Sequence, residues 1–125
     1  QNKLKKGDEV IVPALCWSTS LWPLVQFGLK PVFIDIDPKT LNVNEDELIE
    51  KITPKTRCIF LVNVHGNSCD LFKVKKIAKK KKIILIEDSC ESLGSKLKNN
   101  SHYANNMLDM NGFEERFGLA SPKRE

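Results

Sequence analysis

Several features that define other protein classes are missing from this sequence. No run of about 18 apolar residues occurs, so we expect no membrane-spanning helix. Neither G-x-G-x-x-G nor G-x-x-x-x-G-K-[ST] occurs, which excludes the two common glycine-rich phosphate loops. The cysteines form no C-x-x-C pair, so the tight ligand pairs of most zinc sites are missing. Any ligand site must therefore be built from other residues.

The composition that remains is that of one globular domain. The chain has 125 residues, of which 41% are hydrophobic and 29% are charged, with a formal net charge of +4. It begins with Gln1 rather than Met, and no apolar stretch follows that would indicate a secretory signal. We therefore expect a piece of a longer cytoplasmic protein whose cysteines are reduced thiols: Cys16, Cys58, Cys69 and Cys90.

Apolar segments alternate between strand-like and helix-like patterns as far as about residue 96. Strands are predicted at 10–13, 31–36, 58–64 and 83–86, and helices at about 18–27 and 44–52 and along the apolar positions from Leu71 to Ala78. The order β-α-β-α-β-α-β with short loops predicts an α/β fold, a parallel sheet in a three-layer α/β/α arrangement. Residues 99–125 lack this pattern, and we expect an irregular tail there.

Two helix starts carry recognisable capping residues. Ser18 or Thr19 can cap the first helix, and Gly28 can end it. Asn44 followed by Glu47 resembles a capping box for the second helix.

The predicted topology places three loops where ligands bind in parallel sheets, beyond the carboxyl ends of the strands. These loops lie at 16–18, 65–67 and 88–94. Asp88 ends a strand that reads as buried, where an unpaired carboxylate would cost several kcal/mol. A cation should therefore meet it: a metal ion, a phosphate-bound magnesium ion, a lysine or a protonated pyridine nitrogen. The alternative is that Asp88 or Ser89 caps a helical turn.

Two further residues of these loops are candidates for binding. Trp17 can offer a flat face to a planar ligand, or it can pack against Trp22 or the next helix. Glu91 follows Asp88 by three residues, and two such carboxylates can divide acid and electrostatic roles, although Glu91 can equally be a solvated side chain.

Two other readings of the charged residues remain open. Asp35 and Asp37 also end a strand, and with Asp88 they could form a phosphate or magnesium site in a non-catalytic binding module. The lysines of segment 73–82 could bind nucleic acid, but they flank an apolar stripe without interleaved aromatic residues. A solvated helix face is the better interpretation, so we expect no nucleic-acid partner.

Four segments, taken together and in this order, resemble one known family. GDEVIVPALCWSTSLWPLVQFG, PVFIDIDPKTLNV, LVNVHGNSCD and IILIEDSCESLGS are similar to segments of the DegT/DnrJ/StrS family, whose members are pyridoxal-phosphate enzymes acting on nucleotide-linked keto-sugars. The resemblance covers about residues 4–98. It implies that residues 1–98 are part of the large domain of the fold type I transferase architecture.

The resemblance also implies roles for the three candidate residues. Asp88 matches the aspartate that pairs with the pyridinium nitrogen of the cofactor, and Trp17 matches the aromatic residue that stacks on the ring. Glu91 stands near the ring's 3-oxygen, where aminotransferases of the family usually carry Gln or His. This departure resembles the branch that contains sugar 3-dehydratases, in which histidine replaces the Schiff-base lysine.

By this resemblance, the parent enzyme is an aminotransferase or 3-dehydratase of sugar or lipopolysaccharide biosynthesis. The cofactor would be pyridoxal 5'-phosphate or pyridoxamine phosphate, the substrate a nucleotide sugar, and the assembly a homodimer. The family's phosphate-gripping loop would lie before Gln1, and its catalytic Lys or His would lie beyond the matching region. We therefore assign no catalytic or metal-binding residue, and we expect the chain to be inactive alone.

Overall fold

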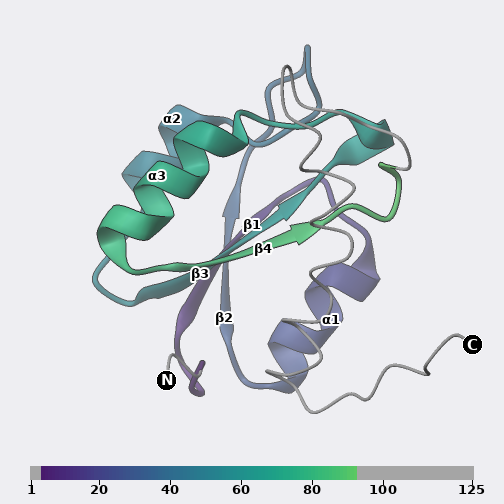
Figure 1. Ribbon diagram of the computed structural model, residues 1–125. Helices are drawn as coiled ribbons and strands as arrows, with labels where there is room; N and C mark the ends of the chain where they lie inside the picture. The colour runs from purple at the N-terminus through teal and green to yellow at the C-terminus, as the bar shows by residue number, and fades with distance from the viewer. Residues whose placement is uncertain (1–3, 93–125) are drawn as a thin grey trace, which may run out of the picture. The chain divides into compact units, whose positions relative to one another are not determined.

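Strands and helices alternate along the part of the chain that the structure, a computed structural model, describes, namely residues 4–92 (Figure 1). The elements are β1 (Glu9–Pro13), α1 (Ser18–Gln26), β2 (Lys30–Ile34), α2 (Glu45–Lys51), β3 (Thr56–Val62), the short 3-10 helix η1 (Val64–Gly66), α3 (Leu71–Lys81) and β4 (Ile84–Asp88). The predicted alternation is therefore confirmed. The expected tail at 99–125 lies outside the described residues.

The strands form one parallel sheet in the order β2-β1-β3-β4. Ile11 of β1 pairs with Val32 on one side and with Ile59 on the other, and Phe60 of β3 pairs with Ile86 of β4. Figure 1 shows α1 on one face of the sheet and both α2 and α3 on the other. Right-handed crossovers produce this arrangement when the chain first turns to one side of β1 and then to the other. The predicted three-layer α/β/α fold is confirmed.

The centre of the sheet is apolar on both faces. Val10, Ile11 and Ile59 are completely buried. On the face that carries α1, Val10 and Cys58 pack against Leu24 of the helix. From α2 and α3, the side chains of Leu48, Leu71 and Val74 are also completely buried. Because β1 and β3 are enclosed in this way, the loops that follow them start from fixed points.

The start of α2 follows the prediction in part. The side-chain oxygen of Asn44 accepts hydrogen bonds from the backbone N–H groups of Asp46 and Glu47, both at 3.1 Å, so Asn44 is the cap. The Glu47 carboxylate does not return to Asn44 as in a capping box. It accepts from the backbone N–H of Asp35 at 2.8 Å and so joins α2 to the end of β2.

The predicted cap of α1 is wrong. Trp17, rather than Ser18 or Thr19, is the N-cap residue, and its side chain makes no capping hydrogen bond. The chain becomes helical immediately after Trp17, so Ser18 and Thr19 already lie in the first turn. Gly28 follows the helix with φ of +68°, as expected of a glycine that ends a helix.

Among the described residues, no helix combines the length and apolar character needed to cross a bilayer.

β2 ends at Ile34 rather than at Ile36, because Ile36 forms an isolated antiparallel bridge with Val43. All four cysteines lie within the described residues and are free thiols, as expected.

Candidate functional site

The candidate site lies where the parallel strands β1, β3 and β4 end. These three strands are neighbours in the sheet, so the loops that follow them meet at one edge. The strand order also reverses here, since the chain leaves β1 for β2 on one side and later builds β3 and β4 on the other. This is the position where open α/β sheets bind ligands.

Asp88 is the last residue of β4, and both of its carboxylate oxygens are hydrogen-bonded. Oδ2 accepts from the Ser20 hydroxyl at 2.9 Å, and Oδ1 accepts from the backbone N–H of Cys90 at 3.1 Å. Burial by itself would raise the pKa of Asp88, but the hydrogen bonds from Cys90 and Ser20 outweigh it and hold the pKa below its ordinary value. Asp88 is therefore ionised at neutral pH.

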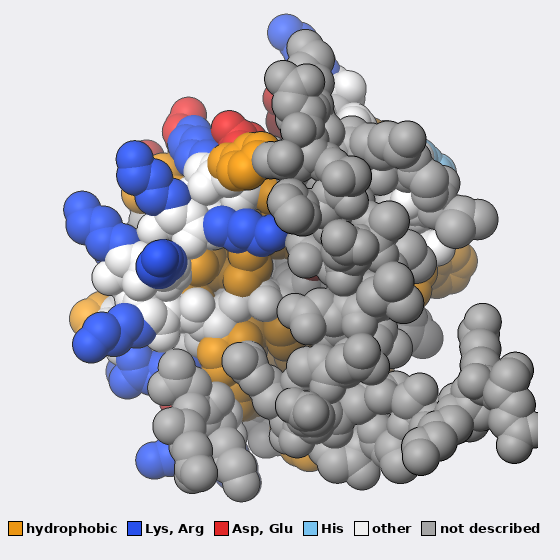
Figure 2. Space-filling model, viewed as in Figure 1, with side chains coloured by type: hydrophobic (Ala, Val, Ile, Leu, Met, Phe, Trp, Pro, Cys, Tyr) orange, Lys and Arg blue, Asp and Glu red, His pale blue; other side chains and the backbone are white. Residues whose placement is uncertain are grey.

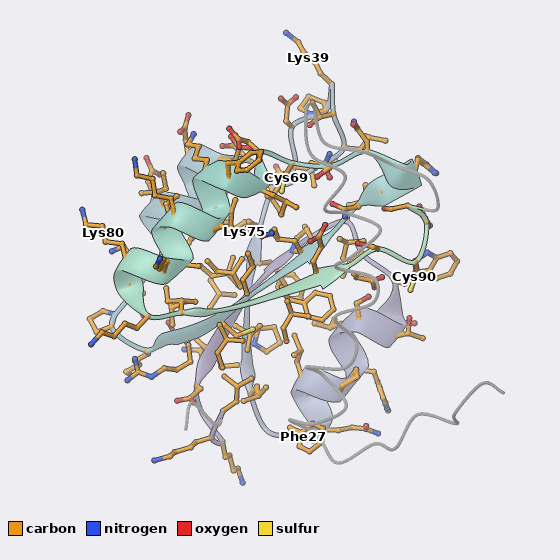
Figure 3. The ribbon with its side chains drawn as sticks, viewed as in Figure 1. Phe27, Lys39, Cys69, Lys75, Lys80 and Cys90 are labelled. Carbon is orange, nitrogen blue, oxygen red and sulfur yellow. The ribbon has the colours of Figure 1, made fainter. Side chains whose placement is uncertain are left out.

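The thiols around Asp88 stay protonated at neutral pH and add no negative charge beside it. Cys90 lies in the turn after β4 (Figure 3), and its hydrogen bond to Asp88 raises the pKa of its thiol. Burial and then the charge of Asp88 raise the pKa of Cys16. Within residues 4–92, no Lys, Arg or His forms an ion pair with Asp88. The carboxylate can therefore accept a hydrogen bond from a cationic N–H group of a ligand.

Glu91 connects the loops that follow all three strands. Its Oε1 accepts from the indole N–H of Trp17 at 3.4 Å, and its Oε2 accepts from the backbone N–H of His65 at 2.6 Å. The backbone hydrogen bond from His65, followed by the one from Trp17, lowers the pKa of Glu91. The structure therefore brings Trp17 and Glu91 together, which their separation of 74 residues does not reveal.

The backbone around His65 is shaped for this contact. His65 has a φ of +54°, in the left-handed region that few residues other than glycine adopt, and Gly66 follows with φ of +76°. The Nδ1 atom of His65 lies 3.7 Å from Oε2 of Glu91. A left-handed histidine costs on the order of 1 kcal/mol of folding free energy, and such backbone strain clusters at functional sites.

Trp17 stands at the start of α1 with its side chain 70% exposed. Because its indole N–H is engaged by Glu91, the ring is held by its edge while its faces stay accessible. Trp17 contacts Glu91, and the alternative that it is simply a core residue packed against Trp22 does not fit this exposure.

Asn63 anchors the ends of β3 and β4 to each other. Its side-chain N–H groups donate to Glu87 at 2.7 Å and to Ser89 at 3.2 Å, and its backbone N–H donates to the carbonyl of Asp88 at 3.0 Å. Sequence reasoning missed both Asn63 and Ser20. A signal for Ser20 exists, since it is a polar residue on the same helix stripe as the core residue Leu24.

The proposed grouping of Asp35, Asp37 and Asp88 is not formed. Asp35 and Asp37 follow β2, which is separated from β4 by both β1 and β3. Asp35 accepts from the backbone N–H of Ile36, and Asp37 accepts from that of Lys39, so both serve local turns. In residues 4–92, no group of three or more His, Cys, Asp or Glu is arranged to hold a metal ion. The magnesium alternative is therefore not supported by the geometry.

Comparison with known proteins gives one family. The sequence model of the DegT/DnrJ/EryC1/StrS aminotransferase family matches residues 1–113. A GDP-4-keto-6-deoxy-D-mannose 3-dehydratase of Yersinia pseudotuberculosis is 52% identical over 95 residues, which are 76% of this chain and 24% of the relative. A GDP-perosamine synthase of Escherichia coli O157:H7 is 37% identical over 95 residues, 76% of this chain and 26% of the relative.

Solved structures of similar proteins agree with this result. A GDP-4-keto-6-deoxymannose-3-dehydratase with a trapped PLP-glutamate geminal diamine superposes with a TM-score of 0.74 at 47% identity, covering 78% of this chain and 25% of that one. NtdA from Bacillus subtilis with bound PMP gives a TM-score of 0.70 at 36% identity, covering 73% and 21%. The chain thus spans about a quarter of the length of these relatives.

Proposed function

Because the chain belongs to the DegT/DnrJ/EryC1/StrS aminotransferase family, we propose that its site holds the pyridine ring of pyridoxal phosphate or pyridoxamine phosphate. The observation that carries this proposal is Asp88, an ionised carboxylate that no cation of residues 4–92 neutralises. A protonated ring nitrogen is a cation that fits, and the accessible indole of Trp17 is a flat surface for the ring. When bound, the protonated ring supplies an electron sink.

Each of the three residues then has one task. Asp88 accepts the hydrogen bond of the ring nitrogen and keeps that nitrogen protonated. Trp17 stacks on the ring, and Glu91 stands near the ring's 3-oxygen. Because the pKa of Glu91 is lowered, its carboxylate is ionised and can only accept, unlike the glutamine amide usual in aminotransferases of the family. Glu91 therefore favours a ring whose 3-oxygen keeps its proton.

For the parent enzyme, we propose a reaction on a nucleotide-linked keto-sugar in sugar or lipopolysaccharide biosynthesis. We favour 3-dehydration over amino transfer as that reaction. The support is the similarity to two GDP-4-keto-6-deoxy-D-mannose 3-dehydratases at 52% and 47% identity, against 37% for the perosamine synthase. Glu91 supports the same branch. The complete parent, purified and supplied with a GDP-4-keto-6-deoxy sugar, should release a 3-deoxy product rather than gain an amino group.

The remaining expectations are also proposals. We place residues 1–98 in the cofactor-binding large domain, consistent with the 95-residue span of the alignments. The free state of all four cysteines supports a cytoplasmic location. Three large apolar residues exposed on and beside α1, Trp22, Val25 and Phe27, support a homodimer in the parent, which sedimentation of the complete protein would test.

Fluorescence tests the ring site directly, because Trp17 and Trp22 are the two tryptophans of the chain. Trp22→Phe leaves Trp17 as the reporter, and Trp17→Phe leaves Trp22, which is also exposed. We expect pyridoxal phosphate to quench the Trp22→Phe variant at low concentration and to leave the Trp17→Phe variant nearly unchanged. Equal quenching of both variants, or none of either, would contradict the proposed ring site.

A further inference from the structure

Ser20 is a buried polar residue to which the proposed function assigns no task. It is only 7% exposed, and it lies in α1 on the side that packs against the sheet. Its hydroxyl oxygen is 2.9 Å from Oδ2 of Asp88, across a separation of 68 residues. A helix residue thus contacts the last residue of a strand at the position where the ring would bind.

The direction of this hydrogen bond follows from the charge of Asp88. An ionised carboxylate has no proton to give, so the Ser20 hydroxyl must be the donor. A donor to a charged oxygen forms one of the stronger hydrogen bonds in proteins. Ser20 therefore stabilises the charged form of Asp88, which is the form that can accept from a ring N–H.

Asp88 is held from two sides, by α1 and by the turn that follows β4. Ser20 of α1 occupies one side of Oδ2, and the backbone N–H of Cys90 occupies one side of Oδ1. Two such contacts fix the plane of the carboxylate. The Cys90 thiol also hydrogen-bonds to the carboxylate, and of its roughly four lone-pair positions one remains that can accept from a ligand in a defined direction.

The same turn of α1 also holds the residue proposed to stack on the ring. The backbone N–H of Ser20 donates to the carbonyl of Trp17 at 3.0 Å. Leu24, one turn further along, is buried against Val10 and Cys58 of the sheet. This turn is therefore fixed to the sheet, and it sets the position of the indole and of the Asp88 carboxylate together.

We propose that Ser20 is a positioning residue, which orients Asp88 toward the ring nitrogen and keeps its carboxylate in register with the indole of Trp17. This inference rests on the proposed function, because it assumes that the pyridine ring binds between these two residues. Ser20 acts on the ring through Asp88.

The first test needs no cofactor. In the 125-residue chain, carbon NMR of the Asp88 carboxyl group follows its titration in the wild type, Ser20→Ala, Ser20→Thr and Ser18→Ala. Ser18 is the matched control, because it lies in the same turn and is exposed. We expect Ser20→Ala to raise the pKa of Asp88, while Ser20→Thr and Ser18→Ala leave it close to the wild-type value. Circular dichroism confirms that each variant is folded.

The second test uses pyridoxal phosphate in the Trp22→Phe background, with quenching of Trp17 for affinity and the nitrogen NMR shift of labelled ring for protonation. We expect Ser20→Ala to bind roughly tenfold more weakly, with a smaller fraction of protonated ring, and Ser20→Thr to recover both. If the Trp22→Phe chain that keeps Ser20 fails to bind, the proposed function fails, and this inference fails with it. If that chain binds and its Ser20→Ala variant matches it in both readouts, the positioning role alone is overturned.

Discussion

The two faces of the sheet differ in how completely their helices cover them. On the face of α2 and α3, the strand residues Ile11, Ile59 and Leu61 are at most 1% exposed. On the face of α1, Phe60 and Ile86 are half-buried. Phe33 of β2 remains 48% exposed. The less covered face carries the carboxylate and the indole of the site.

The helices differ in the same sense. Lysines cover the outer side of α3, and Figure 2 shows them gathered over that helix. Lys73 pairs with Glu45 and Asp46 of α2, and the other lysines of the helix are exposed, as a solvated helix face requires. The sequence of α1 contains no charged residue, and Trp22 is 63% exposed there. The exposed side of α3 is charged, whereas the exposed side of α1 is apolar and its first turn lies at the site.

The largest expected effect comes from opening the covered face. Leu71→Ala removes a completely buried side chain of α3 and should reduce the free energy of unfolding by about 2–5 kcal/mol. Its neighbour Phe72 is 58% exposed, so Phe72→Ala should change it by less than about 0.5 kcal/mol. Urea unfolding followed by circular dichroism measures both. Similar losses in the two variants would show that α3 does not bury the predicted side.

The next effect belongs to the site face and concerns binding more than stability. Asp88→Asn keeps the shape of the side chain but removes its charge, so the affinity for pyridoxal phosphate should fall at least roughly tenfold. The free energy of unfolding should change by less than about 1 kcal/mol. Quenching of Trp17 and urea unfolding measure the two quantities. Asp35→Asn, an exposed carboxylate after β2, is the control and should alter neither.

A smaller loss is expected at the start of α2. Asn44→Ala removes the acceptor for the N–H groups of Asp46 and Glu47, which should cost about 1 kcal/mol of unfolding free energy. Glu50→Ala, on the exposed side of the same helix, serves as the reference and should be nearly neutral. Equal midpoints of thermal unfolding for the two variants would argue against the cap.

One substitution on the covered side should stabilise the protein. Lys82 follows α3 with φ of +56°, a conformation that glycine adopts without strain. Lys82→Gly should therefore raise the free energy of unfolding by up to about 1 kcal/mol, whereas Lys81→Gly, one residue earlier and still helical, should lower it by a similar amount. Opposite shifts of the urea midpoint are the expected result, and shifts of the same sign would contradict it.

The smallest effect is a pH dependence from Asp88. Because its pKa is lower in the folded chain than its ordinary value of about 3.9, the unfolded state binds more protons. The resulting stability is fully present above that ordinary value and is lost as pH falls through the folded pKa. The difference in unfolding free energy between the wild type and Asp88→Asn should therefore shrink in acid. Urea unfolding across a pH series tests this, and a constant difference would refute it.

Local signals predicted most of the fold. Asn44 was recognised as a cap because its acceptor and donors lie within three residues. The partner of Glu47 was missed because the N–H of Asp35 belongs to a strand end twelve residues away. The cap of α1 was misplaced for a similar reason, since the chain turns helical directly on leaving the sheet at Trp17.

The site was predictable only as a set of positions. The carboxyl-end rule placed Asp88 correctly at the end of β4, and the family resemblance singled out Trp17 and Glu91. Which of these residues touch one another depends on contacts that span 26 to 74 residues, and periodicity carries no information at that range. The roles of Ser20 and of the His65 backbone therefore emerged only from the folded chain.

The long separation between Ser20 and Asp88 also orders events during synthesis. At about 5–20 residues per second, a ribosome needs about 3–14 seconds to add the 68 residues between them. The β1–β2 and β1–β3 pairings do not involve β4, whereas the contact of Ser20 with Asp88 requires β4. The proposed ring site is therefore complete only after β4 has joined β3.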